Sequence, residues 1–194
     1  SATRSTSTSI SERACTAAIA QIKALKQLQP RWAARGYPTI DIGCGLNTGD
    51  AVIGNMGSTD RFDYTAMGDT VNLASRLESL TKTYGVHIVV SETTHAFVKE
   101  KFNCRKLDAV KVKGKKIPVT IYELCIQHDE KFTKKYEEAL EHYFKRQFKK
   151  AIGEFKKALA LKENDISCTL FIERCGHFID EPPAKDWDGS YEMK

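Results

Sequence analysis

An asparagine and an arginine lie four residues apart in the stretch GDTVNLASR, as Asn72 and Arg76. If this stretch is helical, their side chains share one face in successive turns. An amide and a guanidinium that point the same way could bind a ligand on which negative charge develops. The alternative is a solvated helix face, the commoner role of such a pair.

Two lysines in the stretch VKVKGK form a second polar pair. Lys111 and Lys113 alternate with valines, so both side chains would lie on one face of a strand, just before a glycine turn. A glycine lets the backbone approach an anion closely. Lysines on an edge strand also protect a sheet against unwanted pairing, and this structural role is the alternative.

The hydrophobic pattern predicts the elements that position these residues. We expect helices at 11–29, 69–84 and 92–100, and strands at 40–46, 51–58, 61–67, 86–91, 105–114 and 117–124. Asp69 is placed to cap the second helix and Gly85 to close it. Strands and helices alternate, so the fold class is α/β or α+β.

The chain changes character after Gln127, where a strongly basic helical region begins. Its small and aromatic residues fit most of the tetratricopeptide pattern; they are Ala139, Tyr143, Phe148, Ala151, Phe155 and Ala158. One such repeat cannot bury its own apolar face. We therefore expect it to pack on the α/β domain, on a third helix from Ser167 to Ile179, or on a protein partner.

The composition is that of an ordinary globular protein, with 194 residues and a net charge of +5. The six cysteines include no C-x-x-C pair and the histidines are scattered, so neither a disulfide scaffold nor a zinc site is predicted. Residues 1–10 lack the apolar core of a signal peptide and are predicted to be a flexible lead-in. The basic helices carry no nucleic-acid reader pattern, so no nucleic-acid partner is expected.

Three separated stretches carry a family resemblance. GLNTGDAVIGNMGSTDRFDYTAMGDTVNLASRLESL, followed by VKVKGKKIPVTIYEL, resembles the second half of the class III nucleotidyl cyclase catalytic domain, with the match running from about Ala14 to Leu124. The ending FIERCGHFIDEPPAKDWDGSYEMK resembles that of bacterial membrane cyclases with an extracytoplasmic CHASE-type sensor. The resemblance implies an α+β, ferredoxin-like cyclase fold at 11–127, lacking its first strands, and a helical tetratricopeptide-like appendage at 128–194.

The resemblance also implies roles for four residues. The family converts ATP or GTP to the 3′,5′-cyclic monophosphate and pyrophosphate, at sites between two catalytic domains. Asn72 is similar to the asparagine that orients the ribose, and Arg76 to the arginine that stabilises charge on the α-phosphate. Lys113 matches the lysine that holds the terminal phosphates. Thr65 lies at a base-selecting position, where a threonine favours ATP.

The metal side of such a site is missing from this sequence. The family binds two Mg²⁺ or Mn²⁺ ions through two aspartates that should lie upstream of the helix at Ser11. Asp63 and Asp69 are better explained as structural residues than as ligands. We therefore expect a piece of a longer parent, inactive alone, whose open sheet edge pairs with another copy or rearranges. The parent would be cytoplasmic, or anchored in the inner membrane with the cyclase on the cytoplasmic side.

Three functions stay open on the sequence. The leading one is the C-terminal part of a homodimeric adenylyl cyclase, with ATP as substrate and the helical tail as an interaction surface. A guanylyl cyclase is the nearest rival within the enzymes. A non-catalytic module, either a degenerate regulatory domain or a helical-repeat docking protein, is the rival of another class. Asn72, Arg76 and Lys113 together argue against degeneracy, because a domain without catalysis has no need of all three.

Overall fold

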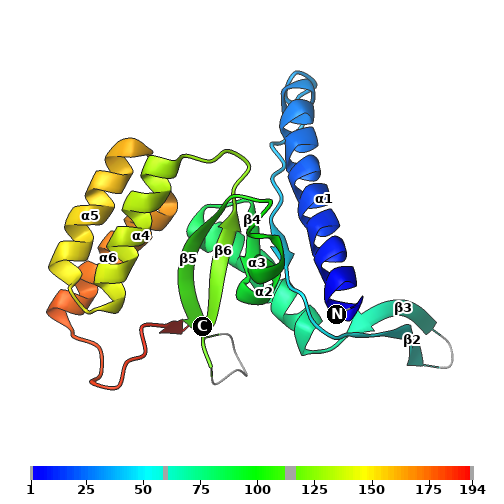
Figure 1. Cartoon of the computed structure of the whole chain (residues 1–194). Helices are drawn as coiled ribbons and strands as arrows, with labels where there is room; N and C mark the ends of the chain where they lie inside the picture. The colour runs from blue at the N-terminus through cyan, green and yellow to red at the C-terminus, as the bar shows by residue number, and fades with distance from the viewer. Residues whose placement is uncertain (1, 59–60, 112–116, 193–194) are drawn as a thin grey trace.

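In a computed structural model of the chain, a five-stranded mixed sheet lies between helices that cover both of its faces (Figure 1). The structure describes residues 2–58, 61–111 and 117–192. The strands are β1 (Cys44–Leu46), β2 (Val52–Ser58), β3 (Arg61–Met67), β4 (Ile88–Ser91), β5 (Cys104–Lys111), β6 (Val119–Leu124) and β7 (Tyr191–Glu192). The helices are α1 (Ala2–Ala33), α2 (Asp69–Tyr84), α3 (Glu92–Val98), α4 (Glu130–Phe144), α5 (Phe148–Leu161) and α6 (Ile166–Asp180).

The first helix is longer than predicted. It begins at Ala2 rather than near Ser11, so residues 2–10 of the expected flexible lead-in are helical, and it continues through Pro30 to Ala33 rather than ending at Gln29. Gly36, with a φ of 75°, follows the helix in the left-handed conformation, which glycine adopts without a steric penalty. Arg35 and Gly36 continue the chain through turn hydrogen bonds to Trp32 and Ala33.

Strand β4, which lies between β1 and β6 in the sheet, separates two apolar layers. All four of its residues are buried, as predicted for a strand inside a covered sheet. Val89 faces the cluster formed with α2 and the C-terminal helices, whereas Ile88 and Val90 face the cluster formed with α1 and α3. This alternation follows from the two-residue period of a strand. The mixed α+β fold predicted from the sequence is therefore observed.

The two edges of the five-stranded sheet differ. The strand order is β1-β4-β6-β5-β7, so β1 forms one edge and pairs in parallel with β4 alone among the described strands. The other edge is covered by β7, in which Tyr191 and Glu192 pair in parallel with Val110 and Lys111. The sequence did not predict β7. The C-terminal segment thus returns to the sheet after the last helix.

The three C-terminal helices pack on the sheet face that also carries α2 (Figure 1). All six residues that matched the tetratricopeptide pattern are buried. The Tyr136 hydroxyl donates a hydrogen bond to the Leu107 carbonyl of β5 at 3.2 Å, and the rings of Phe155 and Phe171 stack 5.0 Å apart. The apolar face is thus covered by the sheet and by a third helix, two of the three alternatives expected. Assignment to the tetratricopeptide family stays a prediction.

No helix in the described part of the chain combines the length and the apolar character that crossing a membrane requires.

Candidate functional site

The junction of β3 with α2 contains three of the four predicted site residues, Thr65, Asn72 and Arg76. Gly68 forms the turn with a φ of 137°, which side chains rarely allow, and its carbonyl accepts hydrogen bonds from the amides of Val71 and Asn72 at 3.1 and 3.0 Å. The N-cap is therefore Gly68, and the prediction that Asp69 caps the helix was wrong. Asp69 is the first helical residue, where its carboxylate interacts favourably with the positive end of the helix dipole.

Asn72 and Arg76 occupy successive turns of α2, on the side that is not packed into the core. Asn72 is exposed and Arg76 is half-buried. Leu73 and Leu77, the neighbours of these two residues in the chain, are buried in the cluster between α2 and the sheet. The apolar side thus fixes the rotation of the helix, and with it the direction in which the amide and the guanidinium lie.

Backbone contact between β1 and α2 fixes how closely the helix approaches the sheet. A Cβ atom at Gly45 would overlap the carbonyl oxygen of Ala74 and the amide nitrogen of Glu78. Only glycine lets the strand lie this close to the helix backbone. The distance between β1 and the helix that carries Asn72 and Arg76 is therefore set by main-chain atoms, which cannot adjust as flexible side chains do.

Asn47, in the loop after β1, is a positioning residue that the sequence analysis missed. Its Nδ2 donates a hydrogen bond to the Thr70 carbonyl at 3.0 Å, and its Oδ1 accepts one from the Ser91 hydroxyl at 2.7 Å. Ser91 is buried and caps α3. Asn47 thereby ties the first turn of α2, two residues before Asn72, to the start of α3. The only signal in the sequence is a polar residue inside GLNTG, and its partners lie 23 and 44 residues away.

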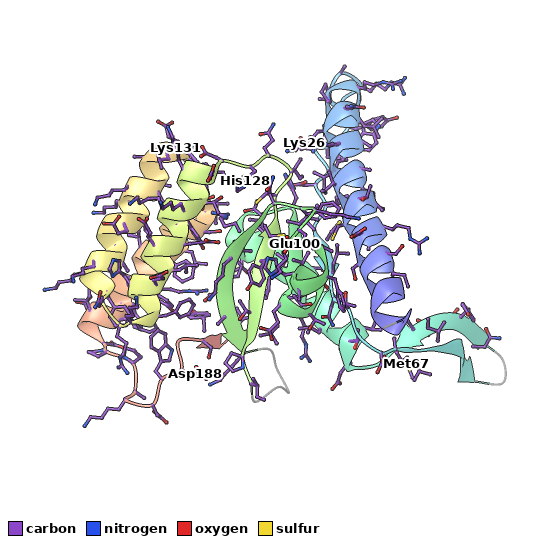
Figure 2. The ribbon with its side chains drawn as sticks, in the orientation of Figure 1. Lys26, Met67, Glu100, His128, Lys131 and Asp188 are labelled. Atoms are coloured by element: carbon purple, nitrogen blue, oxygen red, sulfur yellow. The ribbon has the colours of Figure 1, made fainter. Side chains whose placement is uncertain are left out.

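Thr65 lies on β3, opposite Gly54 of β2, with its side chain exposed. The β2–β3 hairpin extends away from the five-stranded sheet (Figure 1), and Met67 marks its return to α2 (Figure 2). Thr65 is thus three residues from the turn that starts α2, but on a different element from Asn72 and Arg76. The structure does not bring it onto the α2 face itself.

Lys113, the fourth predicted site residue, lies outside the described residues. Lys111, on the same predicted strand face, is the last residue of β5. Its ammonium forms an ion pair with the Asp188 carboxylate at 2.8 Å, and Asp188 lies in the C-terminal segment that leads to β7 (Figure 2). The Lys111 ammonium thus takes part in holding that segment against the sheet.

The titratable groups near α2 offer little nucleophilic or acid–base chemistry. Burial raises the pKa of the Cys44 thiol, and the Glu78 carboxylate adds to the effect, so the unreactive thiol form is favoured. Burial also lowers the pKa of His95, whose ring stacks on Tyr122 with the ring centroids 3.8 Å apart. What the α2 face offers is hydrogen bonding and positive charge, the means by which phosphoryl transfer is catalysed without covalent chemistry.

Magnesium or manganese, the ions implied by the resemblance, require several oxygen ligands. Within the part of the chain that the structure describes, no three His, Cys, Asp or Glu side chains are grouped so that they could hold a metal ion. Asp63 and Asp69 are both exposed and lie on different elements. The described residues therefore do not fit a metal site, and we assign no step to an ion.

A family model described as the adenylate and guanylate cyclase catalytic domain matches residues 2–125. The match includes α1, the sheet as far as β6, and all four predicted site residues. The helices α4, α5 and α6 lie beyond it.

Individual relatives agree with the family match. Adenylate cyclase 1 of Rhizobium meliloti is 40% identical over 113 residues, which are 58% of this chain and 17% of that protein. The solved adenylyl cyclase CyaB of P. aeruginosa is 37% identical with a TM-score of 0.50, and the match covers 58% of this chain and 56% of that one. The solved guanylyl cyclase Cya2 is 32% identical with a TM-score of 0.53, over 59% and 57% of the two chains. The chain thus spans less than a fifth of the R. meliloti protein and little more than half of the solved domains.

Proposed function

Because the chain belongs to the family of adenylate and guanylate cyclase catalytic domains, we propose that it supplies one side of an active site that converts ATP to 3′,5′-cyclic AMP and pyrophosphate. The observation that carries the proposal is the Asn72 and Arg76 pair, held on one side of α2 by the buried Leu73 and Leu77. Thr65 is next to this helix on the chain, at the position where the nucleotide base would be read.

The reaction uses charge and position rather than a covalent intermediate. The ribose 3′-oxygen attacks the α-phosphorus, the bond from that phosphorus to the pyrophosphate oxygen breaks, and the 3′-hydroxyl proton passes to solvent. Asn72 would hold the ribose so that the 3′-oxygen is in line, and Arg76 would neutralise the charge that grows on the α-phosphate. Lys113 would bind the terminal phosphates, which leave as pyrophosphate.

Adenine is favoured over guanine by Thr65, whose hydroxyl can both donate and accept a hydrogen bond. The relatives of this chain include both adenylyl and guanylyl cyclases, so the proposed choice of ATP over GTP rests on Thr65. A competition between ATP and GTP for the parent protein tests it. Preferential formation of cyclic AMP supports the adenylyl assignment, and preferential formation of cyclic GMP replaces it with the guanylyl one.

A second copy of the domain is the proposed partner, because the site residues described here form only one side of a nucleotide site. The β2–β3 hairpin supports this. Its exposed apolar side chains include Ile53 and Tyr64, with exposed fractions of 62% and 76%, together with Val52 and Met67. By the strand register Ile53 and Tyr64 share one face of the hairpin and Val52 and Met67 the other, and exposed apolar side chains on a projecting element are typical of a protein interface. In sedimentation, Tyr64→Asp should shift the parent toward monomer; an unchanged dimer would exclude the hairpin from the interface.

The deciding experiment measures cyclic AMP formation by the full-length parent with ATP and Mn²⁺. Wild type is compared with Asn72→Ala and Arg76→Ala, and with Ser75→Ala as the matched control, because Ser75 is an exposed residue of the same helix. Loss of a preorganised donor to a developing charge typically lowers kcat about 10²- to 10³-fold. We expect that loss in both site variants and near wild-type activity in the control.

Each alternative has its own outcome in that experiment. Full activity in Asn72→Ala and Arg76→Ala would mean that these residues are not in the site. A folded parent that is inactive with both ATP and GTP would favour the non-catalytic regulatory module. Circular dichroism of each variant shows whether a loss of activity comes from unfolding.

A further inference from the structure

The last C-terminal helix, which lies outside the family match, holds the end of α2. The Ser167 hydroxyl of α6 donates a hydrogen bond to the carbonyl oxygen of Tyr84, the final residue of α2, at 2.7 Å. Gly85, which closes α2 in the left-handed conformation, lies so close to Ile166 that a Cβ atom there would overlap the isoleucine side chain. The first residues of α6 thus pack directly on the C-terminus of the helix that carries Asn72 and Arg76.

A buried polar cluster strengthens this contact. The Tyr84 hydroxyl donates to the Asp108 carboxylate of β5 at 2.6 Å, and the Arg174 guanidinium of α6 pairs with the same carboxylate at 2.6 Å. Arg174 also lies 3.4 Å from the Tyr84 hydroxyl. Tyr84 and Asp108 are fully buried and Arg174 is 7% exposed, so water competes little with these bonds. One residue from each of α2, β5 and α6 is therefore joined in a single cluster.

A second attachment of the tail avoids α2. Arg105 of β5 pairs with Asp165, the N-cap of α6, at 3.1 Å, and its Nε donates to Glu123 of β6 at 2.8 Å. This attachment holds α6 to the sheet without contacting the helix of the site. It therefore offers a comparison in which the tail is loosened while the bonds to Tyr84 keep all their groups.

We propose that α6 positions the active-site helix, with Arg174 and Ser167 as positioning residues that act through Tyr84. This inference rests on the proposed function of Asn72 and Arg76. Tyr84 follows Asn72 by twelve positions in one helix, and a helix rises 1.5 Å per residue, so the two lie about 18 Å apart along one rod. A shift of the clamped end moves the whole rod, and a displacement of about 1 Å can cost about a hundredfold in rate. The C-terminal helices thus belong to the working cyclase unit and are not merely attached to it.

The test compares kcat and KM in the full-length protein. Ser167→Ala and Arg174→Lys weaken the contact with Tyr84. Asp165→Asn weakens the ion pairs with Arg105 and Lys162 and changes no group that bonds to Tyr84, and Thr169→Ala changes an exposed residue of α6. We expect the first two to lower kcat per folded molecule about tenfold or more, with KM for ATP little changed, because Arg76 acts in the transition state. The last two should keep kcat within about twofold.

Hydrogen exchange of the α2 amides in the same proteins gives a readout that does not depend on catalysis. We expect faster exchange in α2 for Ser167→Ala and Arg174→Lys than for the two comparison variants. A wild-type kcat together with wild-type exchange in both Ser167→Ala and Arg174→Lys would overturn the proposal. A loss of kcat in Asp165→Asn equal to theirs would also overturn it. If the wild-type parent forms no cyclic nucleotide, the proposed function fails, while hydrogen exchange still decides whether α6 clamps α2.

Discussion

Asn47 and Thr70 are joined by a hydrogen bond of 3.0 Å from the asparagine amide to the threonine carbonyl. The bond connects the loop after β1 with the first turn of α2. Thr70 is only two residues before Asn72 in the chain, so the bond to the loop fixes the turn of helix on which Asn72 lies. The position of Asn72 is thus set by contacts at both ends of its helix, with Asn47 at the start and α6 at the end.

Asn47→Ala should lower both the catalytic rate and the stability. The substitution removes the donor to Thr70 and leaves the Ser91 hydroxyl without its acceptor, at a cost of about 1–3 kcal/mol in the free energy of unfolding. Because the first turn of α2 is then no longer fixed, kcat should fall about tenfold or more. Steady-state kinetics of the parent and urea denaturation measure the two effects. Ser75→Ala is the control, and a stability loss with wild-type kcat would limit Asn47 to a structural role.

Much of this arrangement could be predicted from local sequence. A glycine stands at each end of the helical pattern of α2, and in the structure Gly68 is the N-cap and Gly85 the C-cap of this helix. The apolar run IVVS predicts a strand buried on both faces, and β4 is one. In both cases the signal lies within the element, because backbone freedom and apolar periodicity act over a few residues.

The partners of buried polar residues could not be predicted in the same way. Asp108 and Arg174 are 66 residues apart in the chain, and Ser167 and Tyr84 are 83 residues apart. On the sequence, each looks like an ordinary polar residue in a strand or helix. Their burial follows from how α6 crosses α2 and β5, which no local pattern specifies. The prediction that Asp69 caps α2 was wrong for a local reason, because the adjacent Gly68 occupies the N-cap position with the positive φ of 137° that the turn requires.

Thr65→Val should weaken the discrimination between ATP and GTP. Valine keeps the shape of threonine but removes the hydroxyl, so a hydrogen bond to the adenine edge would be lost. One such bond contributes about 0.5–1.5 kcal/mol, equal to about a two- to tenfold change in relative kcat/KM. Thr65→Ser, which keeps the hydroxyl, is the matched control. An unchanged nucleotide preference in Thr65→Val would mean that another residue reads the base.

Asp108→Ala should destabilise the fold strongly. The carboxylate accepts from Tyr84 and pairs with Arg174, and both partners are buried. Removing it leaves a buried guanidinium without its counter-charge, which typically costs about 3–5 kcal/mol in the free energy of unfolding. Glu100→Ala, at an exposed acid on the surface (Figure 2), should change this free energy by less than about 1 kcal/mol. Urea denaturation compares the two, and an equally small effect at Asp108 would contradict the burial of this ion pair.

Asp165 should make the attachment of the tail sensitive to acid. Burial acts to raise its pKa, but the charges of Arg105 and Lys162, 3.1 and 3.0 Å away, outweigh burial and hold the pKa of this carboxyl below its ordinary value. A lowered pKa in the folded state contributes stability above the unfolded value of about 3.9. That contribution is lost as pH falls through the lower pKa of the folded state.

Asp165→Asn is the variant that isolates this effect. Asparagine also caps helices well, so it can replace the acceptor that Asp165 offers to the Cys168 amide at 3.0 Å, while the charge is removed. The free energy of unfolding of wild type should therefore exceed that of the variant near pH 6, and the difference should shrink steadily below about pH 4. Chemical denaturation at several pH values measures it. A difference that stays constant down to pH 2 would mean that the carboxylate charge does not hold α6 to the sheet.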